Sequence, residues 1–340
     1  MTHAPQFASV VVPSYNRKKL LERTLHALLH QTVPVTAYEI IVVDDGSTDD
    51  TAAYLDDFVR RRQNLRHIHH PENRGVVATR NHGIQEARGD IVIFLDNDNV
   101  PEREFIEAHL WYHGQNADGH VAVMGNARYA SECVEGSNFA RYMQSQYLAC
   151  RPAKNLKGID FSNLPARLLG GLNFSVQRAD LLAVGMLDLH FGAYYGGEDG
   201  ELGYRLHMAG VRIIFGEKAR STHYEQLSIA QYKNKIIEYA REGFRVILAK
   251  SPDYFEQTQI RFLLPADWKA ESLGRIMTKL VMRGALNPVA VIFLERWMTI
   301  TDRCSRFYFR PLYRAMMASW YLQGQKYERG GKRLVNYGDT

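Results

Sequence analysis

The stretch Ile91-Val-Ile-Phe-Leu-Asp-Asn-Asp-Asn99 decides the fold of this chain. Its first five residues are all apolar, and most are β-branched or aromatic, which predicts a strand over Ile91–Leu95 that is buried on both faces. A strand of this kind belongs inside a parallel sheet. Asp96 and Asp98 follow at once, and carboxylates at the end of a buried strand are costly unless something neutralises them. The stretch therefore predicts both a sheet and a charged partner at its edge.

Three further strands alternate with helices before this stretch. β-branched runs predict the strands, and apolar residues three and four positions apart predict the helices. The expected strands are Ala8–Val12, Glu39–Val43 and Leu65–His69, and the expected helices are Lys18–His30, a segment with Ala52, Ala53, Leu55 and Phe58 on its apolar face, and Gly75–Ala87. This alternation builds βαβ units, so the sequence predicts an α/β fold with a mainly parallel, Rossmann-like sheet.

Polar turns follow three of these strands, with the sequences PSYNR, DDGS and DNDN. Ligands of parallel sheets gather at the carboxyl ends of the strands. One such turn is explained by turn chemistry alone, but three at one sheet edge favour a ligand site. A dinucleotide site would need GxGxxG in the first turn. The chain has no glycine there until Gly46, which argues against a nicotinamide or flavin cofactor.

Composition places the chain among ordinary globular proteins, with 46% hydrophobic and 23% charged residues in a length of 340. No apolar run approaches the roughly 20 residues that span a bilayer. The first residues lack the basic and apolar regions of a secretory signal. The three cysteines are far apart and odd in number, which fits a reducing compartment. The sequence therefore predicts a cytoplasmic protein, with peripheral contact at the inner face of the membrane as an alternative.

The first hundred residues resemble a known family. SVVVPSYNR, IIVVDDGSTDDT, NRGVVATRN and IVIFLDNDN occur in the order seen in the family 2 glycosyltransferases of GT-A fold, and the resemblance extends over residues 8–225. It implies a GT-A catalytic domain over residues 1–225, with a nucleotide-sugar-binding half at 1–100 and an acceptor and catalytic half at 101–225. Residues 226–340 are expected to form a mostly helical extension.

The resemblance also implies which residues hold the donor. In the family, the first turn and the second aspartate of DDGS hold the nucleoside, and the NRGVVATRN segment approaches the base and phosphates. The implied donor-binding residues here are Pro13, Tyr15, Arg17, Asp45, Arg74 and Arg80. Solvated surface positions are the alternative for the last two. An aspartate at position 45 that accepts a hydrogen bond from uracil would favour uridine donors.

FLDNDN resembles the metal-binding DXD motif of that family. Hard cations such as Mn²⁺ or Mg²⁺ prefer carboxylate oxygen and neutralise a diphosphate. Alternation along a strand would point Asp96 and Asp98 the same way. Asp98 is the expected metal ligand, and Asp96 is expected at the ribose or at a metal-bound water, as a further metal and donor residue. An Asx-rich turn that its own backbone satisfies is the alternative.

The segment YYGGEDGELGYRLHMAG resembles the catalytic segment of galactosyltransferase-like and bacterial chondroitin-polymerase-like enzymes. By this resemblance Asp199 is the catalytic base and Glu198 hydrogen-bonds the acceptor. Glycines such as Gly171 and Gly197 let the backbone approach the donor closely. A carboxylate near a helix N-terminus stays ionised more readily, and a simple helix cap is the alternative role for Asp199.

His223 in STHYEQ occupies the position of a further metal ligand in related enzymes. A structural histidine is the alternative, since the chain has 13. Asn173 in GGLNFS is expected to line the donor or acceptor pocket. Aromatic side chains could stack on sugars or belong to the core, and the candidates are Trp111, Tyr112, Tyr194 and Tyr195.

The C-terminal region carries the net charge. Residues 301–340 hold eight Lys/Arg and three Asp/Glu, whereas residues 1–300 hold 34 of each sign. Two amphipathic helices are expected, over Ile229–Leu248 and Leu273–Arg283, and arginines interleave with aromatic residues after them. This composition suits an anionic membrane surface. The alternative is a helical extension packed on the catalytic body. Nucleic acid is not an expected partner, because most of the chain is neutral and no such motif occurs.

The sequence thus predicts an inverting, metal-dependent glycosyltransferase that moves a hexose or N-acetylhexosamine from a UDP-sugar. The expected acceptor is a hydroxyl of a glycan, a lipid-linked sugar or a small molecule. The nearest alternative is a nucleotidyltransferase, which shares nucleotide binding at a parallel sheet but does not need the GGED segment. A sugar-nucleotide-binding or membrane-binding protein without catalysis is the remaining alternative.

Overall fold

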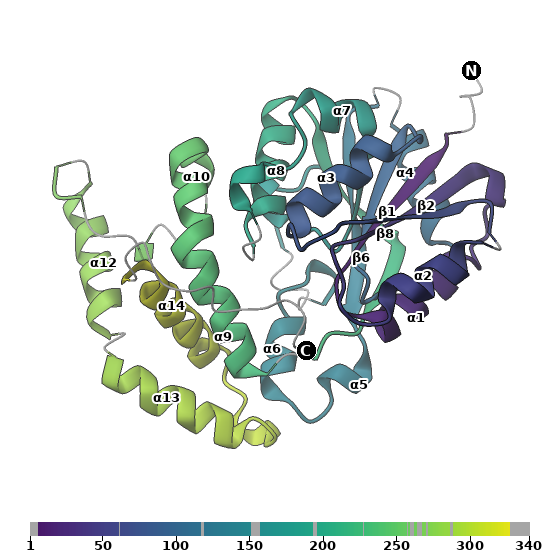
Figure 1. Ribbon diagram of the computed structural model, residues 1–340. Helices are drawn as coiled ribbons and strands as arrows, with labels where there is room; N and C mark the ends of the chain where they lie inside the picture. The colour runs from purple at the N-terminus through teal and green to yellow at the C-terminus, as the bar shows by residue number, and fades with distance from the viewer. Residues whose placement is uncertain are drawn as a thin grey trace.

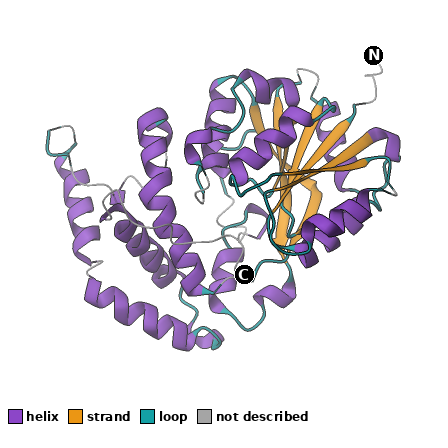
Figure 2. Ribbon diagram, in the orientation of Figure 1, coloured by secondary structure: helices purple, strands orange, loops and turns teal. Residues whose placement is uncertain are grey.

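A computed structural model describes residues 6–60, 62–116, 119–150, 157–192, 196–226, 228–256, 258, 262–263, 267–269, 271–285 and 288–326. It has a sheet covered by helices on one side of the molecule and a group of helices from the C-terminal third on the other (Figures 1 and 2). Eight strands form one sheet in the order β3-β2-β1-β4-β7-β6-β8-β5. The α/β fold with a mostly helical C-terminal part is therefore confirmed.

The strands are β1 Ala8–Ser14, β2 Tyr38–Asp44, β3 Leu65–His69, β4 Ile91–Leu95, β5 Asn99–Pro101, β6 Val121–Tyr129, β7 Asn173–Gln177 and β8 Arg212–His223. The helices of the sheet region are α1 Lys18–Leu28, α2 Thr51–Val59, α3 Val76–Glu86, α4 Phe105–Gly114, α5 Ser131–Val134, α6 Asn138–Gln144, α7 Arg178–Ala183 and α8 Glu198–Met208. The C-terminal helices are α9 Ile229–Glu238, α10 Phe244–Lys250, α11 Pro252–Glu256, α12 Leu273–Ala285, α13 Pro288–Thr301 and α14 Arg310–Lys326.

Strand β4 is buried along its whole length, as its apolar sequence predicts. Its alternate side chains enter two separate cores. Val92 and Phe94 join the core beneath α3, α7 and α8, whereas Ile91, Ile93 and Leu95 join the core beneath α1, α2 and α4. A strand that packs helices on both faces cannot alternate apolar and polar residues, which explains the unbroken run IVIFL.

The sheet is mainly parallel, with two reversed strands. β1 pairs in parallel with both β2 and β4, and β2 pairs in parallel with β3. β7 lies between β4 and β6 and runs antiparallel to both, with Phe94 stacked on Phe174 at a ring distance of 4.4 Å. β5 runs antiparallel to β8. Because β1, β2 and β4 are neighbours in one direction, their carboxyl ends place the three polar turns side by side.

The C-terminal helices pack on one another and on the sheet region. The expected helix Ile229–Leu248 exists, but a π-helical turn over Tyr239–Gly243 separates α9 from α10. Helix α14 lies against α9, with Trp320 fully buried in a core shared with Tyr232, Ile236 and Met298. Within the arginine-rich and aromatic tail, the described segment Arg310–Lys326 is thus a packed helix. Among the described residues, no helix combines the length and the hydropathy of a membrane-spanning segment.

Two buried histidines of α4 form a polar group beneath the sheet. His109 and His113 contact the Ser175 hydroxyl on β7 through distances of 2.8 and 2.9 Å. Burial lowers the pKa of His109 to about 3 and that of His113 to about 4. Both imidazoles are therefore neutral in the folded protein near neutral pH. In the unfolded chain they titrate near a pKa of about 6.5.

Acidification should therefore destabilise the fold through these two side chains. Between about pH 6.5 and 4 the unfolded chain binds protons that the folded chain does not, so the free energy of unfolding falls as the pH falls. Between pH 7 and 5 each histidine should contribute a loss of about 2 kcal/mol. Urea unfolding at both pH values measures this loss, and His113→Gln should lose about 2 kcal/mol less than the wild type. Equal pH dependence of the two proteins would contradict the assignment.

Candidate active site

A cavity of about 490 Å³ lies at the carboxyl ends of β1, β2 and β4. It extends from the first polar turn to the start of α8 and to helices α9 and α14. Most of the residues expected at the site line it, namely Pro13, Tyr15, Arg17, Asp45, Arg80, Asp96, Asp98, Gly171, Gly197, Glu198, Asp199 and His223. These residues come from segments far apart in the sequence, so the fold gathers one polar site from three turns and a helix start.

Asp98 lies between two cationic groups at the floor of the cavity. Arg17 donates to Asp98 Oδ2 at 2.7 Å, and His223 Nε2 lies 3.3 Å from Oδ1. Burial alone would raise the pKa of Asp98, but the His223 and Arg17 charges outweigh it and hold that pKa well below its usual range. Burial would likewise lower the pKa of His223, but the facing Asp98 carboxylate raises it. In this arrangement Arg17 and His223 neutralise Asp98.

The donor set at Asp98 fits a divalent cation that arrives with a diphosphate. Asp98 Oδ1 is buried without a hydrogen-bond partner and faces His223 Nε2. The other ring nitrogen of His223 bonds the Tyr147 hydroxyl at 2.8 Å, which fixes the ring orientation. Among the described residues, no group of three or more His, Cys, Asp or Glu side chains is arranged to hold a metal. One carboxylate and one imidazole suffice where phosphate oxygens of a substrate and water complete the coordination.

Arg80 connects the aspartate turn to the start of α8. Its guanidinium donates to Asp96 at 2.8 Å, to Glu198 at 3.3 Å and to the Gly171 carbonyl at 3.2 Å, and its side chain is only 4% exposed. Burial and the neighbouring Asp199 raise the pKa of Glu198 well above its usual range, although Arg80 opposes this. Two carboxylates from opposite sides of the cavity thus share one cation.

The GGED segment starts helix α8 against the C-terminal extension. Gly197 caps the helix with a φ of 98°, and a Cβ there would lie 2.6 Å from the Tyr239 ring. A glycine is therefore needed for both the backbone and the space. Asp199, in the first turn, accepts a hydrogen bond from the Gly171 N–H at 2.6 Å. This contact positions the Asp199 carboxylate at the cavity rather than as a cap of its own helix.

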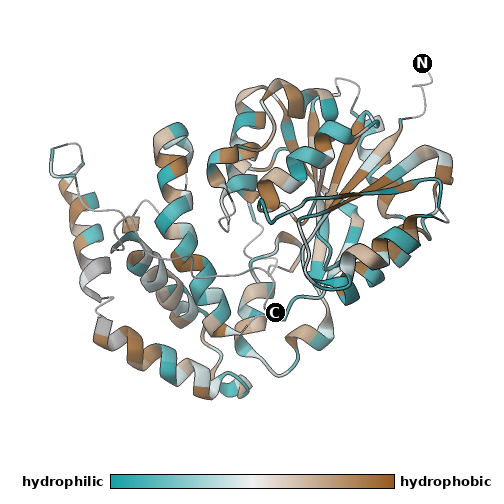
Figure 3. Ribbon diagram, in the orientation of Figure 1, coloured by the Kyte–Doolittle hydropathy of each residue, from teal (hydrophilic) through white to brown (hydrophobic). Residues whose placement is uncertain are grey.

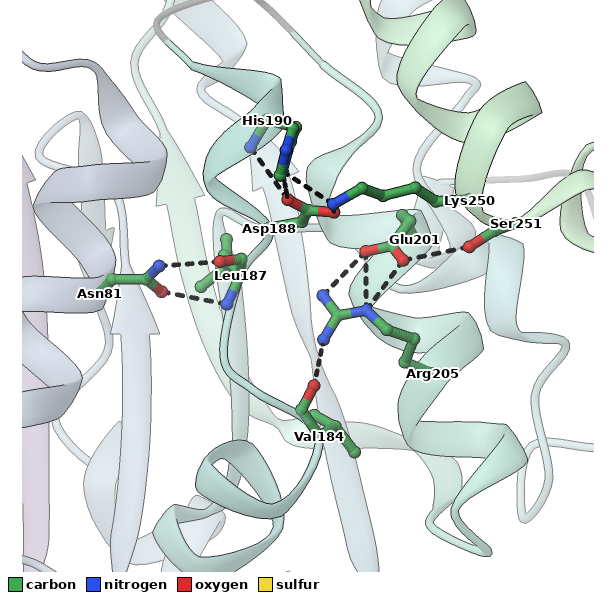
Figure 4. Close-up of polar contacts among 9 residues, drawn as sticks. All are labelled: Asn81, Val184, Leu187, Asp188, His190, Glu201, Arg205, Lys250 and Ser251. Carbon is green, nitrogen blue, oxygen red and sulfur yellow. Dashed lines mark hydrogen bonds and ion pairs between the residues drawn. The ribbon is translucent and has the colours of Figure 1, made fainter.

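Figure 4 shows the polar contacts around Glu201 and Arg205 of α8. Glu201 pairs with Arg205 one turn later at 2.8 Å and accepts from the Ser251 hydroxyl at 3.2 Å. Lys250 donates to Asp188 at 2.6 Å. These contacts join α8 and the loop before it to the end of α10. The extension thus braces the helix that carries Asp199.

Asp45 is held in the second polar turn. Its carboxylate is 4% exposed and accepts from the backbone N–H groups of Arg74 and Gly75 at 2.9 and 2.8 Å. His70 contacts the same carboxylate at 2.8 Å. One oxygen, Oδ2, has a single donor among these contacts, so it retains capacity for a donor from a ligand.

Two expected site residues do not line the cavity. Asn173 is 1% exposed, and its amide bonds the Ala219 carbonyl at 3.1 Å and the Ser221 hydroxyl at 2.9 Å, so the prediction that it lines a pocket is wrong for this side chain. Its strand position turns it toward β6 and β8. The Arg74 side chain is exposed outside the cavity, and only its backbone N–H serves the site through Asp45.

The aromatic candidates for sugar stacking also lie elsewhere. Trp111 is 45% exposed on α4, in edge contact with Tyr112, and Lys218 lies over its ring at 4.3 Å. Neither ring is among the described residues that line the cavity. Tyr194 and Tyr195 lie outside the described residues.

One wall of the cavity was not expected from the sequence. It comes from the extension and consists of Tyr232, Lys235, Ile236, Tyr239, Tyr254 and Tyr321. Tyr232, Ile236 and Tyr239 recur at intervals of four and three, which is one face of a helix. This helical spacing can be recognised in the sequence. Only the fold shows that this face of α9 lies against the GGED segment at the start of α8.

The chain was compared with known proteins. Residues 9–155 match the model of the family described as glycosyl transferase family 2. The chain is 32% identical over 241 residues to validoxylamine A glucosyltransferase of Streptomyces hygroscopicus subsp. jinggangensis, covering 64% of this chain and 55% of that protein. It is 28% identical over 244 residues to chondroitin synthase of Escherichia coli, covering 64% of this chain and 34% of that protein. The chain thus spans about half or less of these relatives.

Solved structures of similar fold include two proteins bound to nucleotide-sugars. The mannosyltransferase PcManGT from Pyrobaculum calidifontis, in complex with GDP-Man and Mn²⁺, aligns with a TM-score of 0.59 at 18% identity over 95% of this chain and 86% of that one. Residues 1–349 of TarS from S. aureus, in complex with UDP-GlcNAc, align with a TM-score of 0.54 at 19% identity over 95% and 93%. At such identities the likeness concerns the fold, which is GT-A.

Proposed function

From the match of residues 9–155 to the family 2 glycosyltransferase model and from the GT-A fold, we propose that the protein is an inverting glycosyltransferase using a UDP-sugar and Mn²⁺ or Mg²⁺. One observation carries this proposal. A single cavity unites the Asp45 turn, the Asp98–His223 pair and the Asp199 carboxylate. The Asp45 turn would bind the nucleoside, the Asp98–His223 pair would bind the cation with its diphosphate, and Asp199 would accept the proton of the acceptor hydroxyl.

The donor is proposed to lie along the polar turns. Tyr15 and Pro13 flank the nucleoside, and Asp45 Oδ2 accepts from the uracil N3–H. Arg17 lies next to the expected diphosphate. The structural relative TarS was solved with UDP-GlcNAc, whereas PcManGT was solved with GDP-Man. The carboxylate at position 45 favours the uridine donor, because a uracil offers an N–H to it.

Asp98 and His223 are proposed to hold the divalent cation, which would neutralise the negative charge that develops on the leaving diphosphate. Arg17 occupies Asp98 Oδ2 in the structure. It is therefore placed to turn toward phosphate oxygens when Asp98 takes a cation. Asp96 accepts a hydrogen bond from Arg80, and we assign it to donor binding.

Asp199 is proposed as the catalytic base. It takes the proton from the acceptor hydroxyl while that oxygen attacks the anomeric carbon and the bond to the diphosphate breaks. One displacement inverts the anomeric centre, so an α-linked donor gives a β-linked product. Glu198 suits the base role less, because the buried Arg80 guanidinium already donates to one of its oxygens. It is instead proposed to hydrogen-bond a hydroxyl of the bound acceptor sugar.

The extension is proposed to form the acceptor side of the cavity. Tyr232, Tyr239, Tyr254 and Tyr321 offer flat apolar rings and hydroxyls opposite the GGED turn. Burial raises the pKa of Tyr239 well above its usual range, so its hydroxyl stays neutral. Rings of this kind suit a saccharide or cyclitol acceptor. The division of the chain at residue 225 stays a prediction, since both parts contribute to the cavity.

Calorimetric titration of UDP, with and without Mn²⁺, tests this function. The wild type should bind UDP at least about tenfold more tightly with Mn²⁺, a difference of about 1.4 kcal/mol. Asp98→Ala should lose this metal dependence, whereas Asp253→Ala, which removes an exposed aspartate of α11, should keep it. Failure of UDP to bind under either condition would remove the proposed donor. A nucleotidyltransferase would release pyrophosphate from its substrate, which an assay that couples pyrophosphatase to phosphate detection distinguishes.

A further inference from the structure

Helix α13 is apolar on two sides. Val291 and Met298 face inward, with exposures of 4% and 1%, and Met298 joins the core that contains Trp320 of α14. On the other side Ile292, Phe293 and Ile300 are 63%, 70% and 76% exposed. A helix at the surface of a water-soluble domain normally keeps one face polar. The outward side of α13 therefore has the composition of a contact surface.

Helix α12 repeats the pattern. Leu273, Met277 and Leu280 recur at intervals of four and three and are 70%, 50% and 44% exposed, whereas Ile276 is buried. Figure 3 shows brown segments recurring along both helices at the edge of the molecule far from the sheet. We call the exposed set the outer apolar face. It consists of Leu273, Met277, Leu280, Val289, Ile292, Phe293, Trp297 and Ile300.

Positive charge lies beside the outer apolar face. Arg296 is exposed on α13 itself, and Arg303 and Arg306 are exposed in the segment that follows. Within the part of the chain that the structure describes, no ion pair involves any of these three arginines. Residues 301–340 as a whole hold eight Lys/Arg and three Asp/Glu. The exposed rings of Phe307 and Phe309 lie in the same segment, with exposures of 46% and 57%.

We propose that the outer apolar face docks on an anionic phospholipid bilayer. The apolar side chains enter the interface between headgroups and acyl chains, and the neighbouring arginines meet lipid phosphates. Because no described helix is long and apolar enough to span a bilayer, the helices lie on the membrane and do not cross it. This inference does not depend on the proposed function, since it uses neither the cavity nor its residues.

Charge disfavours a second copy of the chain as the occupant. Two copies that pair through this face about a two-fold axis present the same surface to each other. That pairing brings the arginines of one copy near those of the other, and no acidic cluster of comparable size lies among the exposed residues of the face. An anionic lipid surface, by contrast, is complementary in both apolar area and charge.

Cosedimentation with lipid vesicles tests the proposal. Full-length protein is mixed with vesicles of phosphatidylcholine containing phosphatidylglycerol, and with pure phosphatidylcholine vesicles, at low and high salt. We expect sedimentation with the anionic vesicles that weakens with salt. Phe293→Ser/Ile300→Ser should lower the apparent affinity at least about tenfold. Arg303→Gln/Arg306→Gln should weaken binding mainly at low salt.

The matched control is Val35→Ser/Leu189→Ser, which removes two comparably exposed apolar side chains, 59% and 62% exposed, from the sheet region. It should bind as the wild type does. All the substituted residues are exposed, so thermal midpoints should not change. Absence of wild-type binding at low salt, or equal loss in the control, overturns the proposal. So does a wild-type dimer in light scattering that Phe293→Ser/Ile300→Ser converts to a monomer, because it assigns the face to a second copy.

Discussion

Asp199→Asn should reduce the rate of UDP release from a UDP-sugar by about 10²–10⁴-fold, the range typical of a lost general base. UDP-glucose, UDP-galactose and their N-acetylhexosamine counterparts serve as probes, with water as the acceptor where no sugar acceptor is known. The loss should fall on kcat, with KM for the donor nearly unchanged. An asparagine keeps the size of the side chain and can still accept from the Gly171 N–H. The variant therefore removes proton acceptance and the negative charge while it keeps this contact.

Two measurements separate this catalytic role from a structural one. The thermal midpoint of Asp199→Asn and its UDP affinity in calorimetry should match those of the wild type. A variant that releases UDP at the wild-type rate would exclude Asp199 as the base. Glu198→Gln provides a contrast within the same helix turn, because Glu198 pairs with Arg80 and its pKa is raised. Glu198→Gln should lose less of the UDP-release rate than Asp199→Asn does, and that difference would identify Asp199 as the base.

Arg80→Met should both destabilise the protein and abolish activity. Among the described residues, Arg80 is the one cation that pairs with both Asp96 and Glu198, and its side chain is buried. Removal of one partner from a buried ion pair typically costs about 3–5 kcal/mol, because a charge is left uncompensated. Methionine retains much of the volume, so the loss reports on charge. Urea unfolding at pH 7 measures it.

The pH dependence of this loss identifies its cause. Without Arg80 the folded-state pKa of Glu198 rises further, so the penalty grows as the pH rises toward that pKa and shrinks at pH 5, where Glu198 can take up a proton. The difference between variant and wild type should therefore be smaller at pH 5 than at pH 7. Arg74→Met is the matched control from the same segment. Because the Arg74 side chain is exposed, its removal should change stability by less than about 0.5 kcal/mol.

The parallel half of the sheet was predictable because each of its elements has a local signal. Leu65–His69 and Ile91–Leu95 are strands with the expected bounds. At Ile91–Leu95 the signal is a five-residue apolar run, rich in β-branched residues and followed by turn residues, which favours a buried strand. The reversed strand β7 was not predicted, because its antiparallel pairing with β4 depends on residues 80 positions away along the chain. The π-helical turn at Tyr239 likewise leaves no mark in the helical periodicity.

The site was predictable as a set of residues but not as a set of pairs. Asp96 and Asp98 were expected to share one direction as strand residues, yet β4 ends at Leu95 and the two carboxylates meet different arginines. Asn173, in GGLNFS, was expected to line the donor or acceptor pocket. The alternation of β7 instead buries its amide against β8. Partners of this kind depend on tertiary distances that spacing along the chain does not encode.

The cavity wall has a consequence for how the protein is made. Pro13 and Tyr321 line the same cavity, although about 300 residues separate them in the chain. A ribosome adds about 5–20 residues per second, so Pro13 is synthesised roughly 15–60 seconds before Tyr321. During translation, the strands β1 to β4 emerge long before the helix that closes the site opposite them. The growing polypeptide therefore passes through a stage in which the polar turns are open to solvent and the chemistry has not begun.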